Sequence, residues 1–299
     1  MTTSPAATNH LLRDETDLQR LRAFLKQLPH KHSVDSFEEQ IQLPAVRAIT
    51  RLWHCDNALI AFAFVDAYNN LLFEIAPKHR SDQLEREIVD WCATCVRQHN
   101  ARTGNELTLD ASSSAEDVER LRFLEKFGFV REPVRSLEYS RPLNAPIEEF
   151  PFPPGFSVRC ATGESEVEAL VTLHRAAFGT DNMTVEERLA IMRAPQYVPE
   201  LDLVAIAPNG ELSAFCICGF EDDDQQMVGY TDPIGAHPRY QKIGLGKAIV
   251  SAGLQALKER GATVAELGTS SENLPMQKLA ERLGFVCIAE SLWFSKKVS

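Results

Sequence analysis

Apolar residues recur along this chain in two periods, one typical of strands and one typical of helices. Continuous or alternating apolar runs predict strands at Ala58–Ala67, Leu71–Ala76, Leu203–Ala207 and Leu212–Phe220. Tyr68-Asn69-Asn70 and Pro208-Asn209-Gly210 predict the turns that join them into two hairpins. Apolar residues three or four apart predict long helices at Asp82–His99 and Leu245–Arg260, the second ending before Gly261.

The remaining elements repeat one order in each half of the chain. In the first half we expect helices at Glu15–Leu28, Phe37–Trp53 and Ala115–Phe127, and strands at Glu106–Leu109 and Val130–Ser140. In the second half we expect helices at Glu164–Phe178 and Val185–Arg193, and strands at Met227–Ile234, Thr263–Leu267 and Phe285–Phe294. A Gly-Phe pair precedes the last strand each time, at Gly128 and Gly284, which indicates an internal repeat.

The repeat predicts two domains. Five prolines fall between Arg141 and Gly155, and proline neither donates a backbone hydrogen bond nor continues a helix. We therefore place one α/β domain at residues 1–145, a proline-rich linker at 146–155 and a second domain at 156–299. A length of 299 residues fits two domains of ordinary size.

Charge and composition narrow the range of partners. The formal net charge of −11 argues against nucleic acid, because phosphate binding needs a basic surface, and suits a cationic or neutral small molecule better. The first residues lack the pattern of a signal peptide, and the longest apolar run, Ala58–Val65, is too short to span a bilayer. We expect a cytoplasmic protein without a membrane partner, and a homodimer is one assembly that the sequence leaves open.

The seven cysteines predict neither a disulfide framework nor a metal centre. They are odd in number, and most of them lie inside apolar runs, where a reduced cysteine packs as a small hydrophobic residue. Cys92, Cys95 and His99 would share one helical face, as a partial zinc site would, but no nearby fourth ligand completes it. We therefore expect core packing and no metal.

The segment Pro238–Lys247 carries the clearest chemical signal. Gly244 and Gly246 leave backbone N–H groups unshielded at the start of a predicted helix, where the helix dipole favours an anion such as a pyrophosphate. The segment is not a Walker A loop, because Ala248 stands where Ser or Thr is required, and it lacks the third glycine of a dinucleotide fingerprint. Glycines that merely allow close packing of helix on strand are the alternative.

The neighbourhood of this loop resembles the GNAT superfamily of N-acetyltransferases. Gln241-x-x-Gly244-x-Gly246 resembles motif A of that family, and Asn273-x-x-Met276-x-x-Leu279-x-x-x-Leu283-Gly284-Phe285 resembles its closing motif. Asp232-Pro-Ile-Gly-Ala-His-Pro looks like a strand of a bacterial GNAT branch. The resemblance covers the chain from Phe156 onward. It implies two tandem GNAT folds, each a mixed, mostly antiparallel sheet flanked by helices, with acetyl-CoA as co-substrate.

The resemblance also implies a cofactor site. Acetyl-CoA would lie in a splay between the strand that ends near Ala236 and the next strand, and Asn273 would contact its pantetheine or adenine side. An amide near Ala236 or His237 would meet the acetyl carbonyl. The pyrophosphate would bind the amides of Gln241, Lys242, Ile243, Gly244, Leu245, Gly246 and Lys247.

The reaction implied is direct attack of an amine on the thioester, which needs a proton acceptor. Asp232 is the first candidate for this base, and His237 is the second because imidazole titrates near neutrality. A histidine beside proline at a strand end can equally serve only the local turn. The general acid of the family is usually a tyrosine at the position of Ala280, but a CoA thiolate can leave without a proton donor because thiols are acidic compared with alcohols.

Aligning the halves shows that the first lacks the cradle. Arg80 falls at Gln241, but Gln83 and Glu85 replace the two glycines and would repel a pyrophosphate. The first half therefore predicts a degenerate GNAT domain, as in tandem members of the family such as mycothiol synthase, and a thiol-conjugate amine is one acceptor class. The alternatives are a catalytically silent acyl-CoA-binding module and an acetyltransferase for proteins or peptides.

Overall fold

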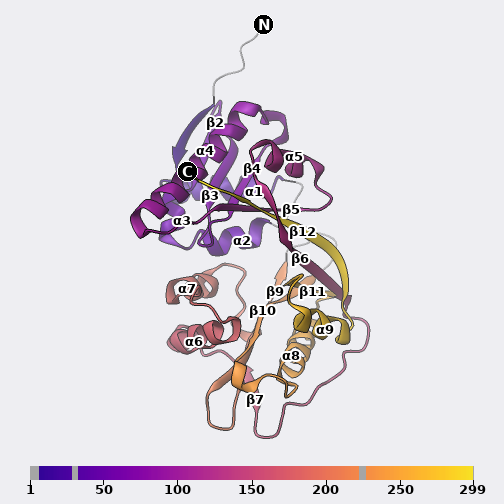
Figure 1. Cartoon of the computed structure of the whole chain (residues 1–299). Helices are drawn as coiled ribbons and strands as arrows, with labels where there is room; N and C mark the ends of the chain where they lie inside the picture. Colours follow the sequence, from indigo (N-terminus) through magenta and orange to yellow (C-terminus); the bar gives the residue numbers. More distant parts are fainter. Residues whose placement is uncertain (1–6, 29–32, 222–226, 299) are drawn as a thin grey trace. The chain divides into compact units, whose positions relative to one another are not determined.

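The computed structural model describes residues 7–28, 33–221 and 227–298 (Figure 1). Its contacts divide the chain into two compact units. Unit 1 contains the residues up to Pro133 and those from Ser291 onward, and unit 2 runs from Val134 to Glu290. The residues 146–155, which the sequence suggests as a linker, fall within unit 2. The domain limits drawn from the sequence stay a prediction.

Unit 1 has an antiparallel sheet of order β1-β2-β3-β4. A bridge between Asn70 and Asp110 joins its last turn to β5, which pairs antiparallel with residues Ser291–Lys296 of the final strand, β12. Its elements are β1 (Thr8–Leu11), α1 (Glu15–Leu25), α2 (Ser33–Gln40), α3 (Pro44–Ile49), β2 (Arg51–Cys55), β3 (Ala58–Val65), β4 (Leu71–Ile75), α4 (Asp82–Thr103), β5 (Leu109–Ser114) and α5 (Val118–Lys126).

Two predictions for this unit are wrong. The helix expected at Phe37–Trp53 breaks before Pro44, which begins α3, and Arg51–Cys55 forms a strand. The strand expected at Glu106–Leu109 begins only at Leu109, because the Asn100 side chain binds the backbone N–H and carbonyl of Leu107 and holds it in the loop. Cys92 and Cys95 lie buried in the core of the unit, as expected.

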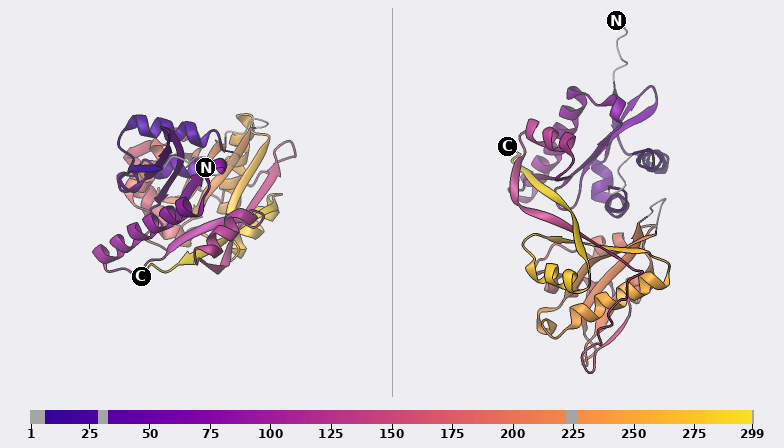
Figure 2. Two further views of the ribbon diagram at one scale, coloured as in Figure 1. Left: turned by 90° about the horizontal axis from the view of Figure 1, so that it is seen from above. Right: turned by 90° about the vertical axis from the view of Figure 1, so that its right-hand side faces the viewer.

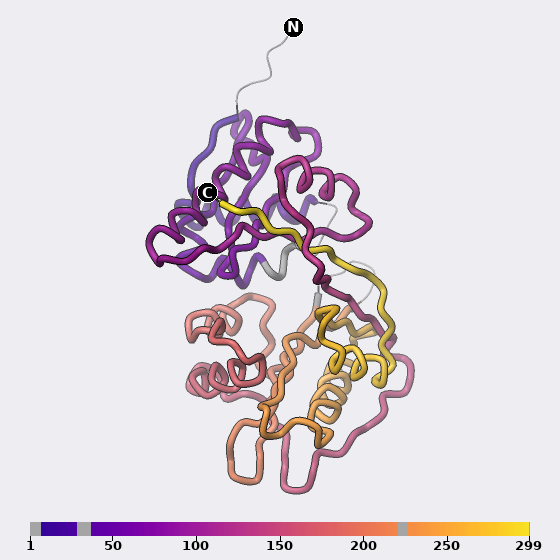
Figure 3. The backbone as a smooth tube through the Cα atoms, viewed as in Figure 1, coloured from indigo at the N-terminus to yellow at the C-terminus, as the bar shows by residue number. Residues whose placement is uncertain are grey.

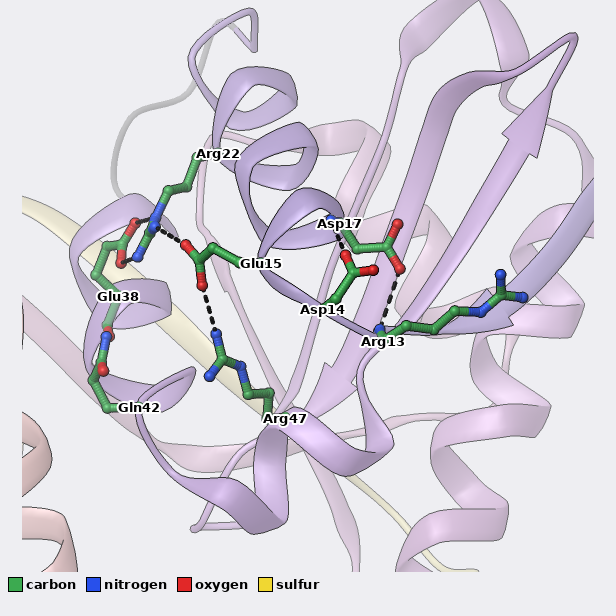
Figure 4. Close-up of polar contacts among 8 residues, drawn as sticks. All are labelled: Arg13, Asp14, Glu15, Asp17, Arg22, Glu38, Gln42 and Arg47. Carbon is green, nitrogen blue, oxygen red and sulfur yellow. Dashed lines mark hydrogen bonds and ion pairs between the residues drawn. The ribbon is translucent and has the colours of Figure 1, made fainter.

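Ion pairs join the first three helices of unit 1 (Figure 4). Arg22 of α1 binds both carboxylate oxygens of Glu38 in α2, at 2.7 and 2.9 Å. Glu15 of α1 accepts hydrogen bonds from Arg22 and from Arg47 of α3. A bidentate ion pair has a defined geometry, so the network holds these three short helices in a defined arrangement.

Unit 2 is built on strands of order β6-β11-β10-β9-β8-β7, antiparallel except between β10 and β11. The two predicted hairpin strands, β8 and β9, pair as expected. The elements are β6 (Val130–Pro142), β7 (Ser157–Cys160), α6 (Val167–Phe178), α7 (Val185–Arg193), β8 (Asp202–Ile206), β9 (Leu212–Glu221), β10 (Val228–Ala236), α8 (Leu245–Glu259), β11 (Val264–Ser270), α9 (Leu274–Arg282) and β12 (Val286–Lys296).

Helices cover both faces of this sheet, α6 and α7 on one and α8 and α9 on the other (Figures 1 and 2). Leu245, Ile249 and Leu254 of α8 pack with Cys216 and Cys218 of β9 in the larger core. Phe215 and Ile217, the alternate residues of β9, pack with Leu170 and Leu173 of α6 in a second core. Successive residues of β9 therefore face opposite sides of the sheet and pack into different cores.

The proline-rich segment between β6 and β7 packs along α8 (Figure 3). Ser251 of α8 donates a hydrogen bond to the carbonyl of Glu148 at 2.7 Å, and the ammonium of Lys247 lies 4.7 Å from the ring centre of Phe150. The buried guanidinium of Arg141 donates to the carbonyls of Leu283 and Pro146. These contacts tie the segment to the helix that carries the candidate site.

Within the described part of the chain, none of the helices has both the length and the apolar character that crossing a membrane requires.

Candidate functional site

Strands β10 and β11 run side by side only where they begin. Parallel pairing joins Val228–Tyr230 to Val264–Glu266. Further along, β10 pairs with β9 as far as Ala236, whereas β11 pairs with β6 as far as Ser270. Each strand then keeps only its outer neighbour, so the two facing backbone edges separate. This splay is the one expected from the sequence.

The amide of Ala236 faces the splay. His237 donates its backbone N–H to the carbonyl of Ser213 at 2.9 Å, so residue 237 faces β9. Backbone groups alternate sides along a strand, and those of Ala236 therefore point away from β9. The carbonyl of Ala236 accepts a hydrogen bond from Nε2 of Gln241 at 3.1 Å. Of the two amides suggested by the sequence, only that of Ala236 remains available.

Helix α8 begins beside the splay without a side-chain cap. Its N-cap is Gly244, with φ of 92°, and Lys242 two residues earlier also has a left-handed φ, of 64°. The first intrahelical bond runs from Ala248 to Gly244, so the N–H groups of Leu245, Gly246 and Lys247 have no partner within the helix. A Cβ built on Gly244 would meet no atom within 4 Å. The arrangement presents bare donors and the positive end of a helix dipole to an anion.

The side chains of the loop have separate roles. Gln241, Lys242 and Ile243 are exposed, whereas Leu245 is buried in the core and anchors the first turn of α8. Gln241 holds the end of β10, as described above, rather than standing free for a ligand. A Cβ on Gly246 would lie 3.7 Å from Leu279 of α9, so both helices border this turn.

His237 is engaged in the local turn. Its Nδ1 accepts the backbone N–H of Arg239 at 3.1 Å. While that bond persists, a neutral ring carries its proton on Nε2 and has no free lone pair for proton abstraction. The alternative weighed from the sequence, a partner of the turn, is the arrangement found.

Asp232 is exposed and has no hydrogen-bond partner among the residues that the structure describes. Its Oδ2 lies 3.2 Å from the position of a Cβ on Gly268, so the carboxyl group crosses from β10 toward β11, over the splay. Although the residue is open to water, the surrounding protein removes enough solvent to raise the pKa of Asp232 to about 7. Such a carboxylate can accept a proton near neutrality.

Further polar residues share this face of the sheet, and sequence analysis did not single them out. Leu267 of β11 and Leu137 of β6 are buried on the α8 side, so their neighbours face the opposite side. Glu138 pairs with Gly268 across the two strands. Together with Asp232 they form a group that we call the polar face; its other members are Ser136, Glu138, Ser140, Tyr230, Glu266, Gly268 and Ser270. It holds three carboxyl groups and no basic side chain.

The start of α9 is capped by Asn273, whose Oδ1 accepts the N–H of Met276 at 3.2 Å. The residue is exposed. Ala280, where the resemblance expects a tyrosine, is fully buried in the larger core. The methyl group therefore serves packing and supplies no proton.

Unit 1 fills the corresponding position with its own side chains. The buried residues of α4 match those of α8 when Leu84 is placed on Leu245, which puts Glu85 at Gly246. Ser81 caps α4 by accepting the N–H of Leu84. The buried Glu85 binds Arg80 at 3.2 Å and Lys126 at 2.8 Å. An open cavity of about 290 Å³ remains beside this cluster, and Arg122 and Glu119 also line it.

Part of the chain matches a known protein family. Residues 167–285 match the family model described as Acetyltransferase (GNAT) family. The mycothiol acetyltransferase of Arthrobacter sp. (strain FB24) is 30% identical over 169 residues, 54% of this chain and 51% of that protein. The mycothiol acetyltransferase of Salinispora tropica is 32% identical over 151 residues, 48% of this chain and 49% of that protein. The chain thus spans about half the length of these relatives.

Solved structures show the same fold over nearly the whole chain. A GCN5-related N-acetyltransferase from Sphaerobacter thermophilus has a TM-score of 0.67 at 18% identity, covering 99% of this chain and 97% of that one. A tandem GNAT protein from the clavulanic acid biosynthesis pathway has a TM-score of 0.71 at 14% identity, covering 98% of both chains. At such identities the likeness concerns the fold alone.

Residues 167–285, which carry most of the splay and the bare start of α8, match the GNAT family of acetyltransferases. The chain as a whole has the fold of tandem GNAT proteins.

The cluster around Glu85 yields a prediction for stability. Glu85→Gln removes the charge that two cations share in a buried position, and we expect the free energy of unfolding to fall by about 1–3 kcal/mol. Glu164→Gln, which breaks an exposed pair with Arg193, should leave the free energy of unfolding almost unchanged. Urea denaturation of both variants measures the difference. Equal stability of the two variants would show that Glu85 does not hold unit 1 together.

Proposed function

We propose that this protein transfers the acetyl group of acetyl-CoA to the amine of a small molecule, at the site in unit 2. The observation that carries the proposal is the uncapped start of α8 beside the splay of β10 and β11. These two features offer an anion site and a free strand edge at one place. Acetyl-CoA combines a pyrophosphate with an amide-containing arm, which are the groups that such donors bind.

The residues fit the co-substrate group by group. The N–H groups of Leu245, Gly246 and Lys247 would bind the pyrophosphate, together with the loop Gln241–Gly244. The pantetheine arm would follow the free edge of β10, and the amide of Asn273 would lie to its side. The N–H of Ala236 would donate to the thioester carbonyl as negative charge develops on its oxygen.

Asp232 is the proposed base. A neutral amine forms a bond to the carbonyl carbon, the bond from that carbon to sulfur breaks, and the amine proton passes to the Asp232 carboxylate directly or through water. With Ala280 buried, no tyrosine is proposed as general acid. The CoA sulfur leaves as a thiolate, which is possible because thiols are far more acidic than alcohols.

The polar face supports an acceptor that carries positive charge. Glu138 is paired with Gly268, toward which the Asp232 carboxyl group reaches, and Glu266 lies two residues before Gly268 on the same face. No basic side chain is among the residues of the polar face. A cationic amine would gain from this field, whereas a carboxylate beside the amine would be repelled. A thiol-conjugate amine remains one candidate class, since the relatives reported above are mycothiol acetyltransferases.

A second candidate function is that of a silent acyl-CoA-binding module. The observation that favours it is Ala280, buried where the family usually has its acid. Acetyl-CoA binding without release of CoA under any acceptor would support this alternative.

A screen of acceptors tests the proposal. We expect release of free CoA to be fastest with cationic small amines and slower with amines that bear a carboxylate. Glu138→Gln should raise the KM for a cationic acceptor several-fold and leave acetyl-CoA affinity unchanged, because the lost charge lies on the acceptor side. Turnover with peptides only, or a Glu138→Gln enzyme with unchanged KM, would contradict the proposed acceptor class.

The anion site has its own prediction. Gly246→Glu places a carboxylate at the bare turn of α8, and we expect acetyl-CoA binding to weaken by about 2–3 kcal/mol. Gly246→Ala is the control, because a Cβ alone meets only Leu279 at van der Waals distance. Calorimetry measures the affinity. If the folded Gly246→Glu protein binds acetyl-CoA as tightly as the wild type, the pyrophosphate does not bind at this position.

The base has a prediction in pH. Because the pKa of Asp232 is raised to about 7, the rate should fall as pH drops through 7, where the carboxylate becomes protonated. Asp232→Asn should remove this acidic limb and lower turnover about 10²- to 10⁴-fold with little change in acetyl-CoA affinity. The free energy of unfolding should not fall at neutral pH. A carboxyl group with a raised pKa in the folded state destabilises the fold as it ionises between about pH 4 and 7, and Asp232→Asn removes that cost. If the Asp232→Asn enzyme keeps wild-type turnover and an intact acidic limb, Asp232 is not the general base.

A further inference from the structure

The turn between β8 and β9 contacts the loop 237–244, which precedes α8, through a small network in unit 2. The short 3-10 turn Pro238–Tyr240 lies between the end of β10 and the bare start of α8. Glu211, at the β8–β9 turn, accepts a hydrogen bond from Nη2 of Arg239 at 2.7 Å and another from the hydroxyl of Tyr240 at 2.9 Å. One carboxylate therefore binds two consecutive residues of the loop.

Other contacts fix the same carboxylate and the same ring. Asn209 accepts the backbone N–H of Glu211 and donates its amide to the Tyr240 hydroxyl at 3.3 Å. The Tyr240 ring lies edge-on to Phe156, with 5.6 Å between ring centres. Hydrogen bonds from Asn209 and Tyr240, with the charge of Arg239, hold the pKa of Glu211 below its ordinary value. The carboxylate is thus charged at neutral pH.

The loop that follows needs such support. Lys242 has a left-handed φ, which is unfavourable for a residue with a Cβ, and Gly244 has another. Both residues are exposed, so packing in the core does not hold them. Outside the network, Gln241 binds the carbonyl of Ala236, and Leu245 is the next buried residue. The conformation that directs the N–H groups outward is therefore braced on one side by Glu211.

We infer that Glu211 is a positioning residue for acetyl-CoA, which keeps the loop 237–244 in its binding conformation before the ligand arrives. This inference rests on the proposed function. A protein whose competent conformation is only partly populated binds with an affinity reduced by that fraction. Loss of the network should therefore weaken binding without touching the chemistry, because Glu211 itself contacts neither the bare amides nor Asp232.

The test compares two isosteric variants of the full chain. Glu211→Gln should raise the Kd for acetyl-CoA about fivefold, as expected for loss of a small exposed network, and leave kcat at saturating acetyl-CoA unchanged. Glu164→Gln is the matched control, because Glu164 and Arg193 form an equally exposed bidentate pair at 2.8 and 2.9 Å elsewhere in unit 2. Its Kd should equal that of the wild type. An unchanged Kd in Glu211→Gln would overturn the inference.

A double-mutant cycle separates positioning from direct contact of Arg239 with the phosphates. If Arg239 acts through Glu211, the effects of Glu211→Gln and Arg239→Gln on the Kd will not add in the double variant. Additive effects would overturn the inference and indicate independent roles. Failure of the wild-type chain to bind acetyl-CoA would instead contradict the proposed function, so the two failures are distinguishable.

Discussion

The departure of β10 from β11 after Tyr230 is the constraint on which the site depends. A strand that loses its neighbour exposes backbone donors and acceptors, and buried groups of this kind need partners. Here the bulged end of β10 keeps β9 on one side, while Gln241 takes the carbonyl of Ala236 on the other. The N–H of Ala236 is left toward the splay. The bare start of α8 lies at the end of the same strand, so strand edge and helix dipole serve one ligand.

Unit 1 shows how the same fold closes such a site. Its α4 matches α8 in the register of buried residues, but Ser81 caps the helix and Glu85 brings its own anion to the first turn. Arg80 and Lys126, which could have bound a phosphate, bind that carboxylate instead. The two halves thus differ less in architecture than in whether the charge at the helix start comes from the chain or from a ligand. The Ser81 cap and the glutamate at the position of Gly246 separate the two cases.

The sequence indicated the local parts of this account and missed the distant ones. Gly244 and Gly246 affect the backbone only within a few residues, so the loop and the helix that follows could be predicted from local sequence. The helix expected at Phe37–Trp53 failed because apolar spacing alone did not weigh Pro44. Glu138 was beyond reach, since it comes from the strand that closes the first half yet pairs with β11 of unit 2. Glu211 was also missed, because its partners lie 28 and 29 residues away and only the fold brings them together.

Titration of the full-length wild-type chain with acetyl-CoA tests the central claim most directly, because the account assigns an open anion site to unit 2 and a self-filled one to unit 1. Calorimetry should give one acetyl-CoA bound per chain. Two equivalent sites per chain would show that Glu85 does not close unit 1, and no binding would show that the start of α8 is not a cofactor site.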